Sequence, residues 1–499
     1  MLKDQKILLG KAKEKEVYML LRQMNRHGLI AGASGTGKTV TLKVIAESLS
    51  DAGVPTFIAD VKGDLTGMIT PGDFSSIQER LDSMSITGFE TKSYPVRFFD
   101  VYKKNGLPMR AVMQEMDPVL LSRILDLSDA QEGVLNIIFK IAEDKDLDII
   151  DLKDLQAMCA YVGENASTFT VNYGMVTKQS VGAIQRKLLV LEQQEGDKLF
   201  GMPGLNIQDL LQTENGNGVM NILECEKLFQ HPLLYATFLL WLLDTLYQNM
   251  PEVGDLDRPK IVFFFDEAHL LFDHAPKALL DKVEQIVKLI RSKGVGVFFC
   301  TQSPSDIPDS ILAQLSNRIQ HALRAYTPSE MKNVKLAAQA FRQNPELNTE
   351  EVITMMKTGH ALVSVLDEDG APTIVEETKI LPPSSSMKAS EVTAIFRTVN
   401  QDPLKSKYWD EVDPESAFEK VDEIKKEAEE EKNRLEEEKK IAKIEEARAK
   451  EAAKQETREE KQRANQSKRI AKKIQNKAEN ELINLGVRSA KKFLKSFMK

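Results

Sequence analysis

The sequence predicts an α/β fold with a mostly parallel sheet, a helical insertion within it and a charged tail after it. Three observations support this prediction. Short apolar runs alternate with helical stretches up to about Leu381, one run is apolar at five successive positions, and charged residues are concentrated after Asp410. Strands that alternate with helices are typical of a parallel sheet with both faces covered.

Six apolar runs are candidates for the central strands. The run IVFFF at Ile261–Phe265 has no alternation of apolar and polar residues, as expected for a strand buried on both faces. The candidates are Gly28–Ala31, Thr56–Asp60, Val219–Leu223, Ile261–Asp266, Val295–Thr301 and Ile319–Leu323. Near the end of the body, Ala361–Leu366 and Pro372–Glu376 flank Asp367-Glu-Asp-Gly370, which predicts a hairpin.

Between the two halves of the sheet, apolar residues follow a helical spacing instead, as at Leu120, Leu121, Ile124 and Leu125. We therefore expect a mainly helical insertion. The expected division is 1–106 for the first half of the core with a short N-terminal β segment, 107–215 for the insertion, 216–381 for the second half of the core, 382–414 for a linker, 415–485 for a charged helical tail and 486–499 for a basic amphipathic terminus.

The tail differs from the body in charge and composition. From Asp410 to Lys499 there are 24 basic and 22 acidic residues, which leaves the body with a net charge of −10. Between Ala417 and Leu485 there is no Pro or Gly, and Glu, Lys and Ala, which favour helices, predominate. Only one heptad register is apolar, whereas a coiled coil needs two. This favours a solvated single helix or a disordered segment over a coiled coil.

The last stretch, Val487–Lys499, carries five basic and no acidic residues among apolar ones such as Phe493, Phe497 and Met498. Such a stretch is suited to weak contact with an acidic lipid surface, nucleic acid or another partner. A frayed terminus in solution is the alternative, and the sequence leaves both open.

Composition excludes several classes of protein. With 499 residues, of which 42% are hydrophobic, the chain is too long for a single core and too apolar for disorder throughout. The net charge of −8 excludes binding of nucleic acid by bulk positive charge. Three widely spaced cysteines predict no disulfide framework or zinc site. No signal peptide or run long enough to span a bilayer is evident, so we expect a cytoplasmic protein without an integral membrane segment.

The segment Gly32-Ala-Ser-Gly-Thr-Gly-Lys-Thr39 matches the phosphate-binding pattern GxxxxGK[ST] between a predicted strand and a helical run. Glycines allow successive N–H groups to surround a triphosphate, and the positive end of the helix adds to the attraction. Lys38 is expected to reach the β- and γ-phosphates of ATP, and Thr39 to hold Mg²⁺. The expected nucleotide-binding residues are Gly32, Ser34, Gly35, Thr36, Gly37, Lys38, Thr39 and Val40.

Asp266 and Glu267 follow the apolar run directly. A carboxylate at this position is suited to holding the hydration shell of Mg²⁺ together with Thr39, and a second one to activating the attacking water. We therefore expect Asp266 to be a metal ligand and Glu267 the catalytic base. Asp266-Glu-Ala-His269 also spells the DEAH box of a large helicase class, but the arginine-rich partner motif of that class is missing from the sequence.

Polar residues end two further strands. Gln302 follows Val295–Thr301 and is a candidate sensor of the γ-phosphate or of the attacking water, with a simple turn as the alternative. Asp60 ends Thr56–Asp60, where a turn and a place at the ligand crevice are equally compatible with the sequence. Arg318 and Arg324, at the two ends of a short strand, are candidates for an arginine supplied to a neighbouring subunit.

Several of these segments together resemble the HerA–FtsK class of P-loop ATPases, and within it the bacterial YjgR-type, helicase HerA-like branch. The resemblance rests on Asn25–Thr39, Ala59–Asp64, Asp126–Gly133, Phe264–His269, Ile290–Gly294, Thr301–Gln302 and Asn317–Leu323, and it spans about Leu2–Leu381. The N-terminal barrel typical of HerA is reduced here to about Leu2–Met19, and no membrane or DNA-reading domain of the FtsK kind is present.

The resemblance implies a RecA-like core, a homo-oligomer that is usually a hexameric ring, and ATP-driven movement of DNA. It also implies that Gln302 is a sensor and that Arg318, ahead of Arg324, acts in a neighbouring subunit. Two other functions remain open: an ATPase that remodels a protein partner without nucleic acid, and a scaffold whose tail recruits partners while ATP controls assembly.

Overall fold

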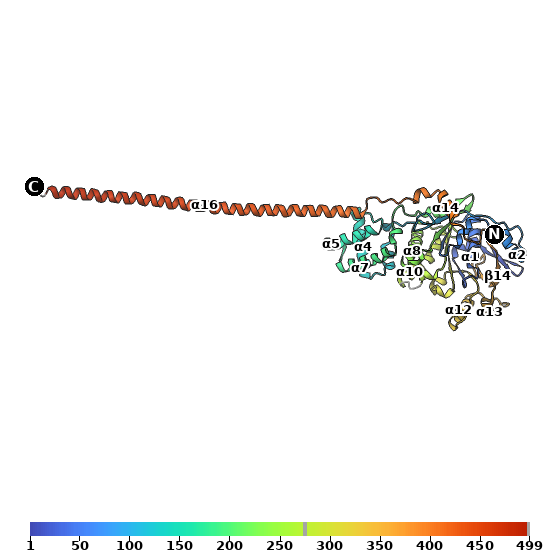
Figure 1. The fold of residues 1–499 in the computed structure, drawn as a ribbon. Coiled ribbons are helices and arrows are strands. Elements are labelled where there is room, and N and C mark those ends of the chain that lie inside the picture. Colours follow the sequence, from blue (N-terminus) through green and yellow to red (C-terminus); the bar gives the residue numbers. More distant parts are fainter. Residues whose placement is uncertain (273–276, 497–499) are drawn as a thin grey trace. The chain divides into compact units, whose positions relative to one another are not determined.

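The computed structural model describes residues 1–272 and 277–496 of the chain. Within these residues, one 12-stranded sheet has the strand order β1-β2-β14-β13-β12-β4-β11-β10-β5-β9-β6, with β3 paired to β2, and a separate small sheet joins β7 to β8. Figure 1 shows helices packed around the large sheet. The α/β fold class predicted from the sequence is therefore confirmed.

The strands are β1 (Leu2–Lys3), β2 (Lys6–Ala12), β3 (Lys15–Leu20), β4 (Gly28–Ala31), β5 (Thr56–Asp60), β6 (Val96–Phe99), β7 (Thr213–Glu214), β8 (Asn217–Gly218), β9 (Met220–Glu224), β10 (Ile261–Phe265), β11 (Val295–Thr301), β12 (Asn317–Gln320), β13 (His360–Ser364) and β14 (Glu376–Ile380). The helices are α1 (Lys38–Asp51), α2 (Phe74–Asp82), α3 (Pro118–Ile124), α4 (Asp129–Asp144), α5 (Leu152–Glu164), α6 (Ala166–Tyr173), α7 (Lys178–Gln193), α8 (Pro232–Asn249), α9 (His269–Phe272), α10 (Lys277–Ile290), α11 (Asp309–Leu312), α12 (Pro328–Gln339), α13 (Thr349–Met355), α14 (Val392–Gln401), α15 (Lys405–Tyr408) and α16 (Ala417–Ser496).

The parallel part of the sheet runs from β12 through β4, β11, β10, β5 and β9 to β6. Every residue of β4, β5, β10 and β11 is buried, which explains why their sequences are mostly apolar. The register pairs Phe265 with Phe299 on one side and with Ala59 on the other. The residues that follow β4, β11, β10 and β5 therefore meet at one edge of the sheet.

Strands β9, β10 and β13 differ from their predicted limits by one or two residues, and β12 and β14 differ because hydrogen bonds to other segments end or delay the ladder. The strand predicted at Ile319–Leu323 is β12, which ends at Gln320. After it, the N–H of Leu323 donates to Ile353 O at 3.1 Å, so the chain leaves the sheet. In the predicted hairpin, the second strand starts at Glu376 instead of Pro372, since the N–H of Val375 donates to Arg342 O at 3.0 Å.

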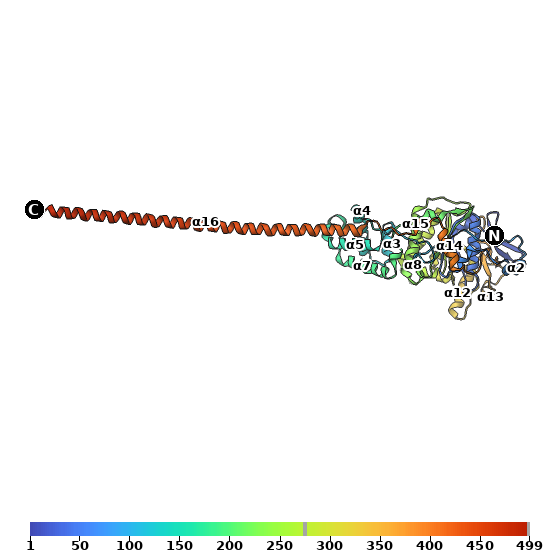
Figure 2. The ribbon, with the colours of Figure 1, turned by 45° about the horizontal axis from the view of Figure 1, so that its top comes forward.

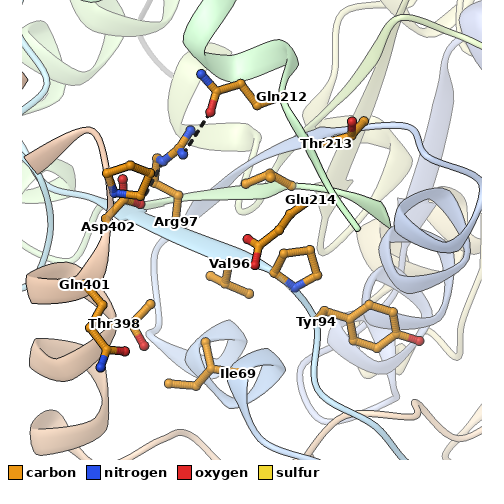
Figure 3. A pocket seen from close by; sticks show the side chains of 13 residues that line it. Ile69, Tyr94, Val96, Arg97, Gln212, Thr213, Glu214, Thr398, Gln401 and Asp402 are labelled. Carbon is orange, nitrogen blue, oxygen red and sulfur yellow. Dashed lines mark hydrogen bonds and ion pairs between the residues drawn. The ribbon is translucent and has the colours of Figure 1, made fainter. Parts of the chain in front are cut away.

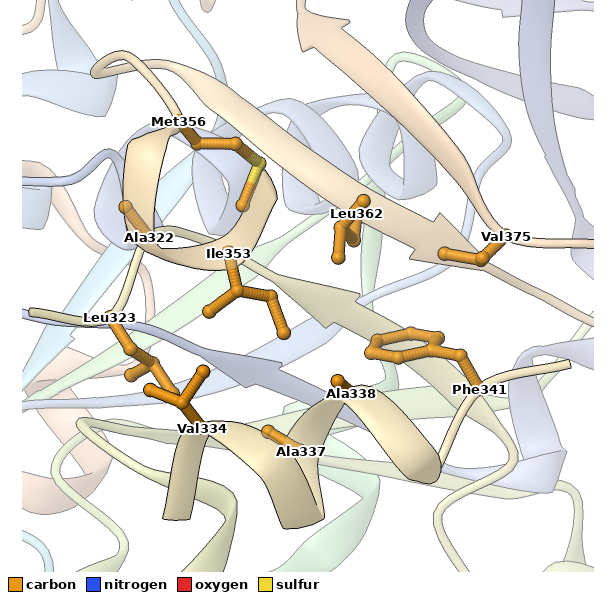
Figure 4. Packing of buried hydrophobic residues seen from close by; sticks show 10 residues of the cluster. All are labelled: Ala322, Leu323, Val334, Ala337, Ala338, Phe341, Ile353, Met356, Leu362 and Val375. Atoms are coloured by element: carbon orange, nitrogen blue, oxygen red, sulfur yellow. The ribbon is translucent and has the colours of Figure 1, made fainter. Parts of the chain in front are cut away.

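The antiparallel part of the sheet joins the two ends of the body. Strands β12, β13, β14 and β2 pair antiparallel in that order, and β1 and β3 both pair with β2. The expected N-terminal β segment thus extends the sheet. Beside it, α12 and α13 enclose an apolar cluster on β13 (Figure 4). That cluster consists of Ala322, Leu323, Val334, Ala337, Ala338, Phe341, Ile353, Met356, Leu362 and Val375.

Helices α3 to α7 lie between β6 and β9 in the sequence, where a helical insertion was predicted. Helix α7 packs against both α4 and α5, and α3 packs against α4. Apolar side chains on these helices are fully buried, among them Leu135, Ile138, Leu155 and Leu188. The helical spacing of the sequence therefore reflects a small core of its own inside the insertion.

The stretch expected to be a linker, 382–414, is ordered and packs on the body. Helix α14 lies against the edge strand β6 and buries Ile395 and Val399. Arg97 on β6 and Asp402 form a buried ion pair of 2.8 Å, and Arg97 also donates to Gln212 at 3.1 Å (Figure 3). A cavity of about 500 Å³ lies beside this pair, away from the sheet edge that carries the sequence motifs.

By its contacts the chain divides into two units, Met1–Val421 and Asp422–Lys499. Helix α16 starts in the first unit, where Asp154 Oδ1 accepts from Phe418 N at 2.9 Å and Val421 is buried. From Lys426 to Lys495 every residue is exposed, and α16 has 80 residues. Figures 1 and 2 draw α16 as one continuous helix. The tail is thus helical; Phe497, Met498 and Lys499 of the predicted basic terminus lie outside the described residues.

Among residues 1–272 and 277–496, no helix has both the length and the apolar composition that crossing a bilayer requires.

Candidate active site

The loop between β4 and α1 has a backbone shape that depends on its glycines. Gly35 and Gly37 have φ values of +74° and +117°, in a region that L side chains rarely adopt. A Cβ atom on Gly32 would lie 2.5 Å from the Cβ of His321. Glycine at these positions therefore lets the loop curl around the start of α1 with its N–H groups available for an anion.

Hydrogen bonds tie this loop to the neighbouring strand ends. They join Gly32 N to Thr301 O (3.1 Å), Ala33 N to Ala322 O (2.9 Å) and Gly359 N to Thr36 O (2.9 Å). Underneath, the buried His321 ring places Nε2 2.9 Å from Thr41 Oγ1 on α1. The loop is thus supported by β11, by the segment after β12 and by the residue before β13.

The Lys38 ammonium lies inside the loop. Its Nζ donates to Gly32 O at 2.7 Å and to Ala33 O at 3.4 Å, and the residue is buried. Burial lowers the pKa of Lys38, while the negative charges of Glu267 and Asp266 act in the opposite direction. Lys38 therefore lies near enough to both predicted carboxylates to interact with their charges, although Asp266 and Glu267 follow it by more than two hundred positions in the sequence.

Asp266 and Glu267 leave the end of β10 in different environments. Burial, together with the negative charge of Glu267, raises the pKa of Asp266 to about 6. For Glu267, burial acts against ionisation, but the hydrogen bond and positive charge of Lys62 outweigh it and hold the pKa below its usual value. Glu267 is therefore the more acidic of the two carboxyl groups.

Three side chains surround the Glu267 carboxylate. Lys62 Nζ donates to Oε1 at 2.5 Å, Gln302 Nε2 donates to Oε2 at 3.4 Å, and His269 Nδ1 lies 3.4 Å from Oε2. Glu267 has a φ of +48°, which is rare for a residue with a side chain. Such backbone strain persists where the surrounding structure enforces it, and it is common at functional sites.

Lys62 is the residue of this site that sequence reasoning missed. It lies in the Ala59–Asp64 segment, whose role the sequence left open between a turn and the ligand crevice. The structure contains both: Asp60 forms the turn by accepting backbone N–H groups, and Lys62 extends to Glu267. Only the pairing of β5 with β10 brings Lys62 and Glu267 together, so no local pattern in the sequence indicates the contact.

Arg318 is not among the side chains around Glu267. Its guanidinium donates to the backbone oxygens of Leu315, Ala340 and Leu312, each at 3.2 Å, and the residue is half-buried. Arg324 is exposed and donates to the carbonyl groups of Thr354 and Met356. Within one chain, both arginines therefore bind backbone carbonyl groups outside this site.

The residues present fit a magnesium nucleotide. Ser34 and Gly35 are exposed at the tip of the loop, and Thr39 and Val40 begin α1 directly after Lys38. The hydroxyl of Thr39 and the carboxylate of Asp266 are oxygen ligands of the kind that Mg²⁺ prefers. In the described part of the chain, no cluster of three or more His, Cys, Asp or Glu side chains could hold a metal ion.

A glycine-rich loop between a buried parallel strand and a helix, with a carboxylate pair at a nearby strand end, defines the class of P-loop nucleotide-binding proteins. Within this class, the chain belongs to the helicase HerA-like family: the family described as "Helicase HerA-like C-terminal" matches residues 5–493. No curated protein sequence matches the chain.

Solved structures support the same fold. The bacterial conjugative coupling protein TrwBdeltaN70 in an unbound form has a TM-score of 0.51 at 14% identity, over 78% of this chain and 93% of its own. The plasmid coupling protein TrwB with a non-hydrolysable ATP analogue has a TM-score of 0.53 at 14% identity, over 79% and 92%. TrwB with ADP and Mg²⁺ has a TM-score of 0.51 at 14% identity, over 77% and 92%. The chain thus has the RecA-like fold of these proteins.

Proposed function

We propose that this protein hydrolyses ATP in a Mg²⁺-dependent reaction, with Lys38 and Glu267 as the central catalytic residues. The observation that carries the proposal is the meeting of Lys38, Asp266, Glu267 and Gln302 at adjacent strand ends, with interacting charges. An ammonium group beside a glycine-rich loop is suited to a polyphosphate, and a nearby carboxylate is suited to a water nucleophile.

In the proposed mechanism, N–H groups of Gly32–Val40 surround the β- and γ-phosphates, and Lys38 moves from the Gly32 carbonyl to phosphate oxygens. Glu267 accepts a proton from water as that water attacks the γ-phosphorus, while the bond from that phosphorus to the β,γ-bridging oxygen breaks and ADP leaves. Gln302 orients the water or senses the γ-phosphate. Thr39 and Asp266 would hold Mg²⁺, which neutralises charge on the phosphates.

Two substitutions test this mechanism. Lys38→Ala should abolish detectable binding of a fluorescent ATP analogue, because the loop loses its positive charge. Glu267→Gln keeps the shape of the side chain but removes its basicity, so it should bind ATP with near-normal affinity and lower kcat by roughly 10²-fold or more. Steady-state phosphate release and equilibrium binding measure both. Hydrolysis by Glu267→Gln at the normal rate would show that Glu267 is not the base.

We further propose that the protein assembles into a ring, hexameric by analogy with its class, and uses ATP to move along DNA. Membership of the helicase HerA-like family and the fold shared with a plasmid coupling protein support this proposal. The net charge of −10 in the body does not oppose it, since a basic loop lining a pore is enough to hold a strand.

The alternative is an ATPase that remodels a protein partner, through the tail or otherwise. Comparison of the ATPase rate with and without duplex or single-stranded DNA separates the two functions. A salt-sensitive stimulation by DNA is expected for a translocase, because contacts with phosphates release counterions. A rate that DNA leaves unchanged at low salt would favour the protein partner.

A further inference from the structure

The Glu267 carboxylate is held from both neighbouring strands of the sheet. Lys62 follows β5 and donates to Oε1 at 2.5 Å, and Gln302 follows β11 and donates to Oε2 at 3.4 Å. Strand β10, which carries Glu267, lies between β5 and β11. Each carboxylate oxygen of the proposed base therefore already accepts a hydrogen bond from a residue that follows a neighbouring strand.

The segment that carries Lys62 is itself rigidly supported. The buried Asp60 carboxylate accepts the backbone N–H groups of Lys62 at 3.2 Å, Gly63 at 2.8 Å and Leu65 at 2.9 Å. The backbone of this turn is thus fixed at the end of β5. Only the side chain of Lys62 remains free to change direction, and it is 43% exposed, whereas that of Glu267 is 6% exposed.

The contact with Lys62 opposes the role of Glu267 as a base. An ammonium group at hydrogen-bonding distance stabilises the carboxylate and lowers its tendency to take a proton from water. It also occupies a lone pair of Oε1, the kind of site that the attacking water would need. A γ-phosphate beside Lys38 would offer the Lys62 ammonium a more highly charged partner than a single carboxylate.

We propose that Lys62 is a positioning residue that restrains Glu267, and that a bound triphosphate draws the Lys62 ammonium away only in part, so that a restraint on the base persists while ATP is bound. The inference rests on the proposed ATPase function and adds control of the same site. It explains why a partly exposed lysine contacts an almost fully buried carboxylate at the edge of the sheet where phosphate would bind. The expected consequence is a low basal rate of ATP hydrolysis.

Lys62→Met removes the charge and keeps most of the length of the side chain. Without the restraint, the basal kcat at saturating ATP should rise roughly two- to tenfold, as expected for the loss of one half-exposed ion pair. The KM for ATP should not fall, because Lys62→Met also removes a cation that would attract the γ-phosphate. Lys62→Arg retains a cation and should keep kcat near the wild-type value.

The conservative variant separates a restraint from a merely structural role. If Lys62 only supported the structure of the site, Lys62→Met should lower kcat. If Lys62 restrains Glu267, kcat should rise in Lys62→Met and return to the wild-type value in Lys62→Arg, which restores a cation beside Oε1.

Lys92→Met is the matched control, because Lys92 forms an ion pair of 2.6 Å with Asp51 at a similar exposure of 44%. It should change neither kcat nor KM. A Lys62→Met protein with a lowered or unchanged kcat would overturn the restraint. A wild-type protein that binds ATP but never hydrolyses it would contradict the proposed function. If Lys62→Met then gained ATPase activity, the restraint would still be supported. If both proteins stayed inactive, the restraint would fail together with the proposed function.

Discussion

Among individual residues, two buried histidines have the clearest electrostatic consequence. Burial lowers the pKa of His27 and of His321 to about 4 in each case. His27 Nδ1 accepts the N–H of Val297 at 3.0 Å on β11, and His321 lies under the phosphate-binding loop. Both rings are therefore part of the support of the site and must remain neutral to stay buried.

This predicts a loss of stability in acid. Below pH 6.5 an unfolded histidine takes up a proton that the folded His27 does not, so the free energy of unfolding falls as pH decreases from 6.5 towards about 4. His27→Asn should reduce this slope by about 1.4 kcal/mol per pH unit in that window. Asparagine suits the φ of +56° at this position, and its Oδ1 can accept the N–H of Val297.

Urea unfolding at several values of pH measures the slope for both proteins. Other groups, such as Asp266, also titrate in this range, but they contribute equally to wild type and variant. Parallel dependences of the two proteins on pH would contradict the assignment to His27.

At the scale of elements, the turn after β5 determines where Lys62 lies. Asp60 Oδ1 accepts the N–H groups of Lys62 and Gly63, and Oδ2 accepts that of Leu65. Loss of these acceptors leaves N–H groups without partners near a buried strand end, which is costly. A single carboxylate therefore organises the loop that restrains the proposed base.

Asp60→Ala should lower the free energy of unfolding by about 1–3 kcal/mol, the usual cost of unsatisfied buried donors. Asp60→Asn keeps an oxygen at Oδ1 and should lose less. Urea denaturation of both variants against wild type gives the difference. Equal stability of Asp60→Ala and wild type would show that water replaces the carboxylate in this turn.

At the scale of the whole molecule, the arginine candidates concern assembly. Arg318 donates to three carbonyl groups of its own chain, so its proposed role in a neighbouring subunit requires this side chain to turn towards that subunit. Arg318 is the arginine proposed to act in the nucleotide site of a neighbouring subunit, and Arg324 is the alternative.

A mixing experiment tests the role of Arg318. Arg318→Ala and Lys38→Ala should each be inactive alone, and a mixture should recover part of the ATPase activity if the arginine acts across subunits. In mixed rings, the Lys38→Ala subunit supplies the arginine to an intact nucleotide site. Arg324→Ala in the same mixture is the comparison. Particle size confirms that rings form, and intact rings without recovered activity would contradict the proposal.

Whether the ATPase activity depends on the tail distinguishes a motor from a scaffold. Helix α16 is exposed from Lys426 to Lys495, and the unit Met1–Val421 contains all the residues of the proposed site. Removal of Asp422–Lys499 should therefore leave the basal ATPase rate within about twofold of wild type, as for surface changes remote from a core. An ATPase rate that falls to background in a folded truncated protein would favour the scaffold.

Much of the site was predictable because its signals are local. The glycines, Lys38 and Thr39 lie within eight residues between a strand and a helix, and five apolar residues identify the strand before Asp266. The limits of β12 and β14 were less predictable, because hydrogen bonds from Leu323 and Val375 to distant carbonyl groups end or delay the ladders. The linker was also predicted without its packing on β6, since turn residues do not reveal which surface they cover.

The sequence by itself determined the phosphate-binding loop, the carboxylate pair and the charged tail, which it left open between a single helix and a disordered segment, since each depends on residues close together in the chain. Only the tertiary structure decided which strand ends meet: β11 separates β4 from β10, and β5 lies on the far side of β10. That order places Gln302 and Lys62 on opposite sides of Glu267. Pairing between distant strands depends on the packing of the whole sheet, which no short segment encodes.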